Sequence, residues 1–341
     1  MTWSFAVGPG ASGDNIPSTE LTEAYGRVVT WRVDGHAFAQ FSIDGRAEET
    51  AEIRLLESDL WAWRDGADVF HGRIVGAQPD LNEDRHVVQF QAIDYRGMLS
   101  AAAKIEPPIP TFSQVDQAQI VWDLVQHRQA QTGGDWGIVE GLGSTSGQLR
   151  DESDITPGSP VGDVIDRVLR RENGGEWEIS PDLVLNRWFP QRGSDNGVVL
   201  DLGGALTQIK RTTPEFGNAA VATGDQTTST ATAQTPDVGT DPRGRWTVSQ
   251  GFPTVSVQST VAAKAAWLRD EASTIEHEWA VTLAPEVWEG PDNLWIGDTV
   301  TLSVNDGWLT ESGKHRVVEL QATPGDDGTE TIRLGLVGVP T

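Results

Sequence analysis

The sequence predicts a mainly β protein in which two β-barrel modules flank a small α+β domain. Residues 60–95 read as three alternating strands joined by polar turns, and residues 298–336 repeat that pattern. Between these two regions, apolar residues recur at helical spacing in two stretches. We therefore expect a mainly β fold with an α+β insertion.

The first β module is expected over residues 21–104. Residues 1–20 are rich in Gly, Pro and Ser and predict an irregular N-terminal arm. A hairpin is predicted over residues 26–43, because Asp34-Gly35 is a favoured two-residue turn. The alternation of Ala51, Ile53 and Leu55 predicts a further strand.

The strands of residues 60–95 are the clearest in the chain. Trp61 and Trp63 alternate with polar neighbours, and Asp65-Gly66 supplies a tight turn. A second alternating run ends at Val75, and a third follows a polar loop. Together with the preceding hairpin, this number of strands is enough to close a small barrel or sandwich.

The α+β domain is expected over residues 105–200. It begins where three prolines between residues 107 and 110 end the first module. Ser113 is the predicted N-cap of one helix, and Ser159-Pro160 opens another. Residues 176–189 then read as a hairpin.

The second β module is expected over residues 201–341. Residues 225–244 contain almost nothing to bury and predict a mobile loop, whereas an Ala-rich stretch near 261–275 predicts a helix. Alignment of Arg73-Ile74-Val75 with Arg316-Val317-Val318 keeps the following strands in step to within about one residue. The sequence therefore predicts the same β module twice.

Composition excludes several classes of protein. The 341 residues include no cysteine, so a disulfide scaffold, a thiol nucleophile and a thiolate metal site are excluded. The net charge of −25 is opposite to that of a sequence-nonspecific nucleic-acid binder. No apolar run is long enough for a membrane span, and the N-terminus lacks the basic start of a signal peptide, so we expect a soluble protein made in a cytoplasm. Among the 25 basic residues only four are Lys, which indicates a GC-rich genome.

No motif predicts a catalytic, cofactor or metal site. The letters of Gly8 to Gly13 match a dinucleotide fingerprint, but Pro9 lacks an amide and no helix is predicted to follow. His277-Glu278 lacks the second His that a zinc protease requires. The acidic run over residues 326–330 lacks the alternating ligands of a calcium loop and reads as a turn. We expect that the chain is not an enzyme.

The tryptophans allow two interpretations. Six of the 14 Trp lie in or beside predicted strands, where burial in a core or subunit interface is the ordinary outcome. A platform for sugar stacking is the alternative. The six are Trp31, Trp61, Trp63, Trp279, Trp295 and Trp308.

In domain order, nearly the whole chain resembles the tail-hub proteins of long-tailed bacteriophages, also called minor tail or baseplate hub proteins. The resemblance lies in two strands of the first module, the hairpin of the insertion and two strands of the second module. These segments are Val69 to Val75, Val88 to Asp94, Gly175 to Phe189, Leu294 to Leu302 and Arg316 to Val318. Each motif is loose and none is catalytic.

The resemblance implies a structural virion protein of a siphophage. In that family, two tube-like barrels per subunit form a pseudo-sixfold ring as a homotrimer, which continues the tail tube at the tail tip and forms part of the DNA conduit. The implied partners are the distal tail protein, the tape-measure protein and tip or fibre proteins, and assembly takes place in the host cytoplasm. Because the sequence stops at Thr341, we expect none of the C-terminal extensions that some relatives carry.

Two other functions remain open from the sequence. A carbohydrate-binding adsorption module would use exposed Trp side chains. A different tail-tip component, such as a distal tail protein, would assemble as a hexamer rather than a trimer.

Overall fold

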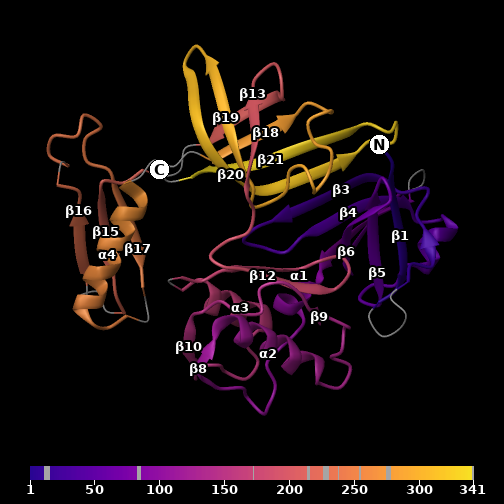
Figure 1. Ribbon diagram of the computed structural model, residues 1–341, viewed down its shortest axis with the longest axis horizontal. Coiled ribbons are helices and arrows are strands. Elements are labelled where there is room, and N and C mark those ends of the chain that lie inside the picture. The colour runs from indigo at the N-terminus through magenta and orange to yellow at the C-terminus, as the bar shows by residue number, and fades with distance from the viewer. Residues whose placement is uncertain are drawn as a thin grey trace. The chain divides into compact units, whose positions relative to one another are not determined.

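A computed structural model provides the fold, shown in Figure 1. The structure describes residues 1–10, 16–82, 86–171, 173–212, 216–225, 230–236, 238–252, 255–273 and 278–339. The chain divides into two compact units. Unit 1 comprises Met1–Gln208 and Val281–Val339, and unit 2 lies within Ile209–Ala280.

The first β module of unit 1 is antiparallel, with β4 beside β7 and the N-terminal strands at one end. Asp65 and Gly66 have φ angles of 50° and 82°, so the predicted tight turn between β5 and β6 is confirmed. The elements are β1 (Trp3–Pro9), β2 (Thr19–Glu20), β3 (Tyr25–Arg32), β4 (Phe38–Asp44), η1 (Glu48–Glu52), β5 (Ser58–Arg64), β6 (Ala67–Leu81) and β7 (His86–Asp94).

Two expectations for this module are wrong. The predicted irregular arm of residues 1–20 contains β1, which pairs with the whole of β5 and buries Phe5 and Val7. Its alternating apolar residues therefore outweigh the nearby Gly and Pro. The strand predicted from Ala51 to Leu55 is instead the 3-10 helix η1 and a turn, because these side chains have no core face to cover.

The insertion contains helices packed against short strands, as expected. Apolar side chains of α1, α2, α3, β11 and β12 form one core that includes Leu124, Ile165 and Trp177. No helix in the described part of the chain is long and apolar enough to cross a membrane. The elements are α1 (Tyr95–Ala101), β8 (Phe112–Asp116), α2 (Gln117–Gln129), β9 (Val139–Glu140), β10 (Leu149–Glu152), α3 (Val161–Leu169), β11 (Glu176–Ile179) and β12 (Val184–Trp188).

The helix caps differ from those expected. Ser113 lies in β8, and Asp116 caps α2 by accepting from the Ala118 N–H at 2.8 Å. Ser159 precedes α3 but makes no cap, since its hydroxyl contacts Thr156 at 2.7 Å. Helix α1 was not predicted, because Ile93-Asp94-Tyr95 continues the alternation of the preceding strand.

The second β module completes unit 1. Its strands are β13 (Asp195–Asp201), β14 (Leu206–Thr212), β18 (Glu278–Leu283), β19 (Thr299–Asp306), β20 (Leu309–Pro324) and β21 (Glu330–Gly338). Strands β14 and β18 carry the chain into and out of unit 2. The two modules share a 13-stranded sheet of order β14-β18-β21-β20-β3-β4-β7-β6-β5-β1-β2, in which β19 also pairs with β20 and β13 pairs with β19. The prediction of a mainly β fold with an α+β insertion is confirmed.

Unit 2 is a three-stranded sheet with one helix. Its elements are β15 (Ala219–Thr223), β16 (Thr230–Gln234), β17 (Thr247–Gly251) and α4 (Gln258–Ser273), with strand order β16-β15-β17. The expected helix near 261–275 is therefore present. Strand β16 lies within residues 225–244, where a mobile loop was expected, and its short Ala231 and Ala233 side chains pack against the core of Val261 and Ala265.

Candidate assembly site

The two β modules repeat one strand irregularity at equivalent positions. In the β6–β7 pair, the register steps from Ile74 opposite Ala92 to Gly76 opposite Gln91, so Val75 is an extra residue. In the β20–β21 pair, it steps from Val317 opposite Leu336 to Glu319 opposite Gly335, so Val318 is extra. Such β-bulges bend a strand and increase its twist. The strand registers thus confirm the alignment of residues 73–75 with residues 316–318.

The turn before β5 in the first module is repeated before β19 in the second. Leu56 and Gly297 both have left-handed backbones, with φ angles of 66° and 93°. Their N–H groups donate to the carbonyl oxygens of Ile74 at 2.9 Å and Val317 at 2.7 Å, the residues just before the two bulges. Since only Gly adopts this conformation without strain, Leu56 shows that the turn is retained against local preference.

The strand order of the two modules matches as well. The first module runs β3-β4-β7-β6-β5, and the second runs β14-β18-β21-β20-β19. Strand β14 is thus the counterpart of β3, and β20 is the counterpart of β6.

The modules are joined where β3 pairs antiparallel with β20, just beyond the second bulge. Glu319 lies opposite Arg32, and their side chains form an ion pair at 2.7 Å. Gln321 lies opposite Thr30 and donates to its hydroxyl at 3.4 Å. This junction places the two modules side by side in one continuous sheet.

A buried ion pair fastens the same two modules at a second place. The Arg64 guanidinium of β5 binds Glu330 of β21 at 2.7 Å, with side-chain exposures of 4% and 1%. Arg64 also donates to the Trp288 carbonyl at 3.0 Å, and Trp3 donates to Glu330 at 2.9 Å. Because a buried charge without its partner is costly, these contacts couple β1, β5 and β21.

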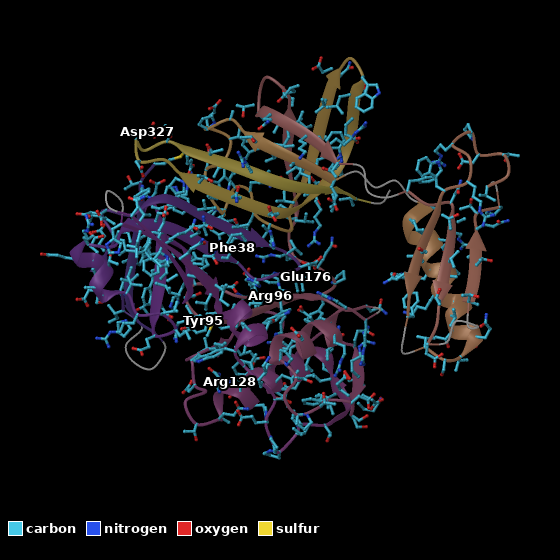
Figure 2. The ribbon with its side chains drawn as sticks, turned by 180° about the vertical axis from the view of Figure 1, so that it is seen from behind. Phe38, Tyr95, Arg96, Arg128, Glu176 and Asp327 are labelled. Carbon is cyan, nitrogen blue, oxygen red and sulfur yellow. The ribbon has the colours of Figure 1, made fainter. Side chains whose placement is uncertain are left out.

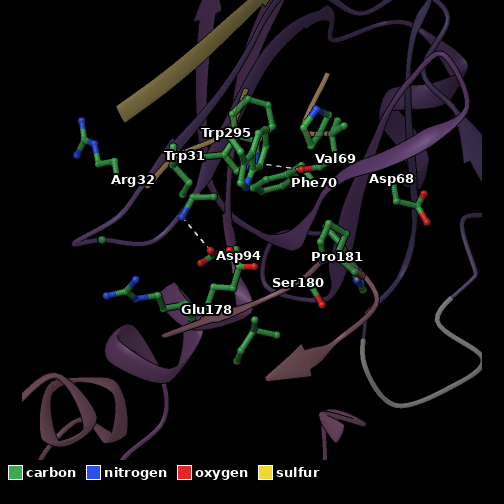
Figure 3. Close-up of a pocket in the computed structure, with 17 residues that line it drawn as sticks. Trp31, Arg32, Asp68, Val69, Phe70, Asp94, Glu178, Ser180, Pro181 and Trp295 are labelled. Atoms are coloured by element: carbon green, nitrogen blue, oxygen red, sulfur yellow. Dashed lines mark hydrogen bonds between the residues drawn. The ribbon is translucent and has the colours of Figure 1, made fainter. Parts of the chain in front are cut away.

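A cavity of about 200 Å³ lies where both modules meet the insertion (Figure 3). Trp31, Phe70 and Trp295 form its apolar wall, and Asp94 and Glu178 lie on its polar side. Burial raises the pKa of Asp94 to about 7, against hydrogen bonds from the Gly97 and Ala37 N–H groups at 2.7 and 2.8 Å. One carboxylate oxygen of Asp94 therefore caps the start of α1, and the other binds the backbone between β3 and β4.

A second buried carboxylate, Asp59, lies beside this cavity. It accepts hydrogen bonds from Tyr95 at 2.5 Å, from His71 at 3.2 Å and from Arg73. Burial opposes its ionisation, but these donors outweigh burial and hold the pKa of Asp59 below its usual range. The other His71 ring nitrogen lies 2.8 Å from the Pro181 carbonyl, so this cluster joins β5 and β6 to the insertion.

Two further arginines connect the insertion to the β modules. Arg96 of α1 donates to the Val33 carbonyl at 2.8 Å and to the Trp177 carbonyl at 2.9 Å. Figure 2 shows Arg96 and Tyr95 where the first module meets the insertion. Arg316 of β20 binds both carboxylate oxygens of Glu176 at 2.7 Å. The charged groups at these seams are thus engaged in holding parts of the fold together.

Most strand tryptophans are core residues, as their positions predicted. Trp31, Trp61 and Trp279 are buried, and Trp63 and Trp295 are partly buried. Trp308 is the exception, with 85% exposure at the tip of the β19–β20 hairpin. Figure 1 shows this hairpin projecting from the sheet.

The motifs set aside from the sequence form no common site. Gly8 and Pro9 end β1, and residues 11–13 lie outside the described residues, as does His277. No group of three His, Asp or Glu side chains suited to a metal occurs among the described residues. Sequence reasoning missed the Asp59 and Glu330 clusters, since the partners of Glu330 lie more than 260 positions away and only folding brings them together.

Comparison with known proteins shows similarity in structure but not in sequence. No protein-family model and no curated protein matches the sequence. A 43 kDa tail protein of prophage MuSo2 from Shewanella oneidensis superposes with a TM-score of 0.66 at 14% identity, covering 99% of this chain and 98% of that one. A tail protein from Neisseria meningitidis has a TM-score of 0.62 at 12% identity, covering 99% and 97%.

A bacterial secretion component has a similar fold. The Escherichia coli c3393 protein, part of the type VI secretion system and described as similar to the T4 tail proteins gp27 and gp5, has a TM-score of 0.52 at 12% identity, covering 93% of this chain and 74% of that one. Over nearly its whole length, this chain therefore has the fold of phage tail proteins.

Proposed function

We propose that the chain is a structural virion protein that forms a trimeric hub at the tip of a phage tail. The observation that carries this proposal is the duplicated β module, with matching bulges at Val75 and Val318 and a side-by-side junction through β3 and β20. One chain then supplies two consecutive segments of a ring, and three chains supply six. A closed ring also removes open sheet edges that would otherwise propagate.

In this role the hub forms the closing ring at the end of the tail tube. Its three subunits present six modules, which match the sixfold symmetry of the tube. Its partners would be the distal tail protein, the tape-measure protein and tip or fibre proteins, in a virion assembled in the host cytoplasm. The fold shared with prophage tail proteins supports a place in a tail. The preference for Arg over Lys is consistent with a GC-rich host of a siphophage.

Counting the subunits in an intact tail tests the proposal. Three copies in one ring at the tail tip, each contributing two modules, are the expected result. A hexamer would instead favour a distal tail protein, and one barrel per copy in the ring would contradict the proposal. The count belongs in the assembled tail, because neighbouring proteins contribute to ring formation.

The charge fits a passage for DNA through the ring. Neutralising phosphates with arginine clusters releases counterions and creates points where DNA is retained, so a conduit wall should avoid such clusters. The net charge of −25 has the required sign, although solubility would account for the same total. Acidic side chains on the axis-facing surface of the ring are expected in a map of the assembled hub. A neutral or basic channel with acids confined to the exterior would refute the conduit.

Exposed tryptophans favour a second function, carbohydrate binding during adsorption. Trp308 is 85% exposed at the hairpin tip, and Trp246 and Trp267 of unit 2 are about half exposed. Aromatic faces of this kind can stack on sugar rings. A glycan-binding screen with wild type and Trp308→Ala separates the two functions, because a hub need not bind glycan on its own.

A further inference from the structure

We propose that strand β14 of one copy pairs antiparallel with residues 76–79 of β6 in the next copy, and so closes the ring. This inference rests on the proposed ring of repeated modules and identifies the surfaces that join its subunits. The partner is a second copy of this chain. The junction would repeat, between chains, the one that β3 and β20 form within the chain.

The accepting edge is the part of β6 beyond its bulge. Beyond the equivalent bulge of β20, residues 319–322 pair with β21 on one side and with β3 on the other. Residues 76–79 pair with β7, but no strand of the described chain pairs with their opposite side, since β5 reaches only to Arg73. Gln78 occupies the position of Gln321 and is exposed. The first module thus has an open edge where the second has a strand.

The donating edge is β14. It is a terminal strand of the sheet and pairs with β18, just as β3 pairs with β4. Apart from a bridge between Leu206 and Leu202, its outer side has no strand partner among the described residues. Thr207, Gln208 and Lys210 are exposed along it. The strand that would complete the first module of a neighbour is therefore the one that the second module leaves uncovered.

The two edges complement one another rather than themselves. Each chain carries one donating and one accepting edge, so copies join head to tail, and such contacts close into a ring when the rotation permits. Within the chain, the equivalent junction of β3 and β20 includes the ion pair of Arg32 with Glu319.

The junction between chains would be weaker than the one within the chain. Gly76 occupies the position of Glu319, so the ion pair with a neighbouring strand is absent at that step. Pro79 occupies the position of Ala322 and has no N–H to donate. Pro and Lys also protect open edges in proteins that stay monomeric. An experiment must therefore distinguish edges that pair with a second copy from edges that are protected against pairing.

Engineered disulfides provide the test, because the chain has no cysteine of its own. One variant combines Gln78→Cys with Thr207→Cys, and another combines Gln78→Cys with Gln208→Cys. Successive side chains of a strand point to opposite faces, so only one of the two should cross-link efficiently. Thr30→Cys with Gln321→Cys is the positive control, expected to link within one chain. Gln78→Cys with Thr310→Cys on exposed β20 is the negative control.

Each variant is oxidised as the full chain, at high concentration and in assembled tails, and the products are weighed by native and denaturing mass spectrometry. Cross-links between chains in one β14 variant, ending at a closed trimer without larger products, would support the junction. Three-membered rings that give no link above the negative control would overturn the junction but leave the proposed hub intact. Absence of both rings and links in assembled tails would refute the hub itself.

Discussion

At the residue scale, the charged groups of unit 1 are used to hold its parts together. Arg64, Arg96 and Arg316 each connect elements that are distant in sequence, and their partners are carboxylates or carbonyl oxygens. Buried pairs of this kind contribute little net stability compared with apolar packing, but loss of one partner is costly. These pairs hold both modules and the insertion in one arrangement.

Glu330→Gln is expected to lower the free energy of unfolding of unit 1 by roughly 3 kcal/mol, because it leaves the Arg64 guanidinium buried without a counter-charge. Chemical denaturation monitored by Trp fluorescence measures the change. Glu57→Gln is the matched control, since its pair with Arg54 is more than 70% exposed and should change stability little. Equal effects of the two variants would show that the buried Arg64–Glu330 ion pair is no more important for stability than an exposed pair.

The raised pKa of Asp94 predicts that the free energy of unfolding depends on pH. Its pKa is raised to about 7 in the folded chain, so the folded state binds a proton that the unfolded state has released. Its contribution to stability is therefore full below the unfolded pKa and is lost as the pH rises through about 7. Between pH 6 and 8, wild type should lose on the order of 1 kcal/mol through this group. Asp94→Asn should remove that loss, and an unchanged slope in denaturation at several pH values would contradict the assignment.

At the element scale, the two bulges determine how the long strands meet their neighbours. Each bulge changes the register by one residue, and beyond it the strand stays paired with the strand that follows but no longer pairs with the one that precedes it. Beyond Val318, β20 passes from β19 to β3, and beyond Val75, β6 passes from β5 to an open edge. The β-bulge of β20 thus lies at the junction within the chain, and the equivalent bulge of β6 lies at the edge proposed to join a neighbouring copy.

Deletion of Val318 tests the bulge. Without the extra residue, either the side chains after it, including buried Leu320 and Ala322, face the wrong side of the sheet, or pairing with β21 is lost. We expect a loss of more than about 4 kcal/mol, or no folded protein. Val318→Ala keeps the backbone and should cost about 1 kcal/mol or less. A deletion that is tolerated as well as the Ala variant would show that the bulge is dispensable; circular dichroism and thermal melting report the result.

At the scale of the whole molecule, the two units differ in how much core they contain. Unit 1 contains an extended sheet and the insertion core, whereas the core cluster of unit 2 consists of Ala222, Val261 and Ala265 with partly buried neighbours. A unit with so few apolar groups gains little stability by burial. Unit 2 should therefore unfold first.

Ala265→Asp places a charge in the core of unit 2, where Ala265 is fully buried. The variant should lose protection from hydrogen exchange in β15 and α4, while the thermal transition of unit 1 is retained. Ala263→Asp on an exposed position of α4 is the control and should leave protection unchanged. Joint loss of both units would show that they fold cooperatively.

The sequence alone determined the local patterns of the fold. Alternation predicted most strands, helical stripes predicted α2, α3 and α4, and the match of residues 73–75 with 316–318 revealed the repeat. These features depend on neighbours within a few positions, so they are visible in the residues themselves. Strand β1 and helix α1 were missed because nearby Gly and Pro, or a continuing alternation, obscured them.

Only the tertiary structure decided which strands meet and which edges stay open. Strand β3 pairs with a partner almost 290 residues away, and Arg64 finds Glu330 at a similar separation. Such pairings are chosen by shape and burial across the whole sheet, because an open strand offers the same backbone groups to any partner. The sequence thus contains the two modules, but only the strand order of the folded chain leaves the candidate assembly edges on β6 and β14 open.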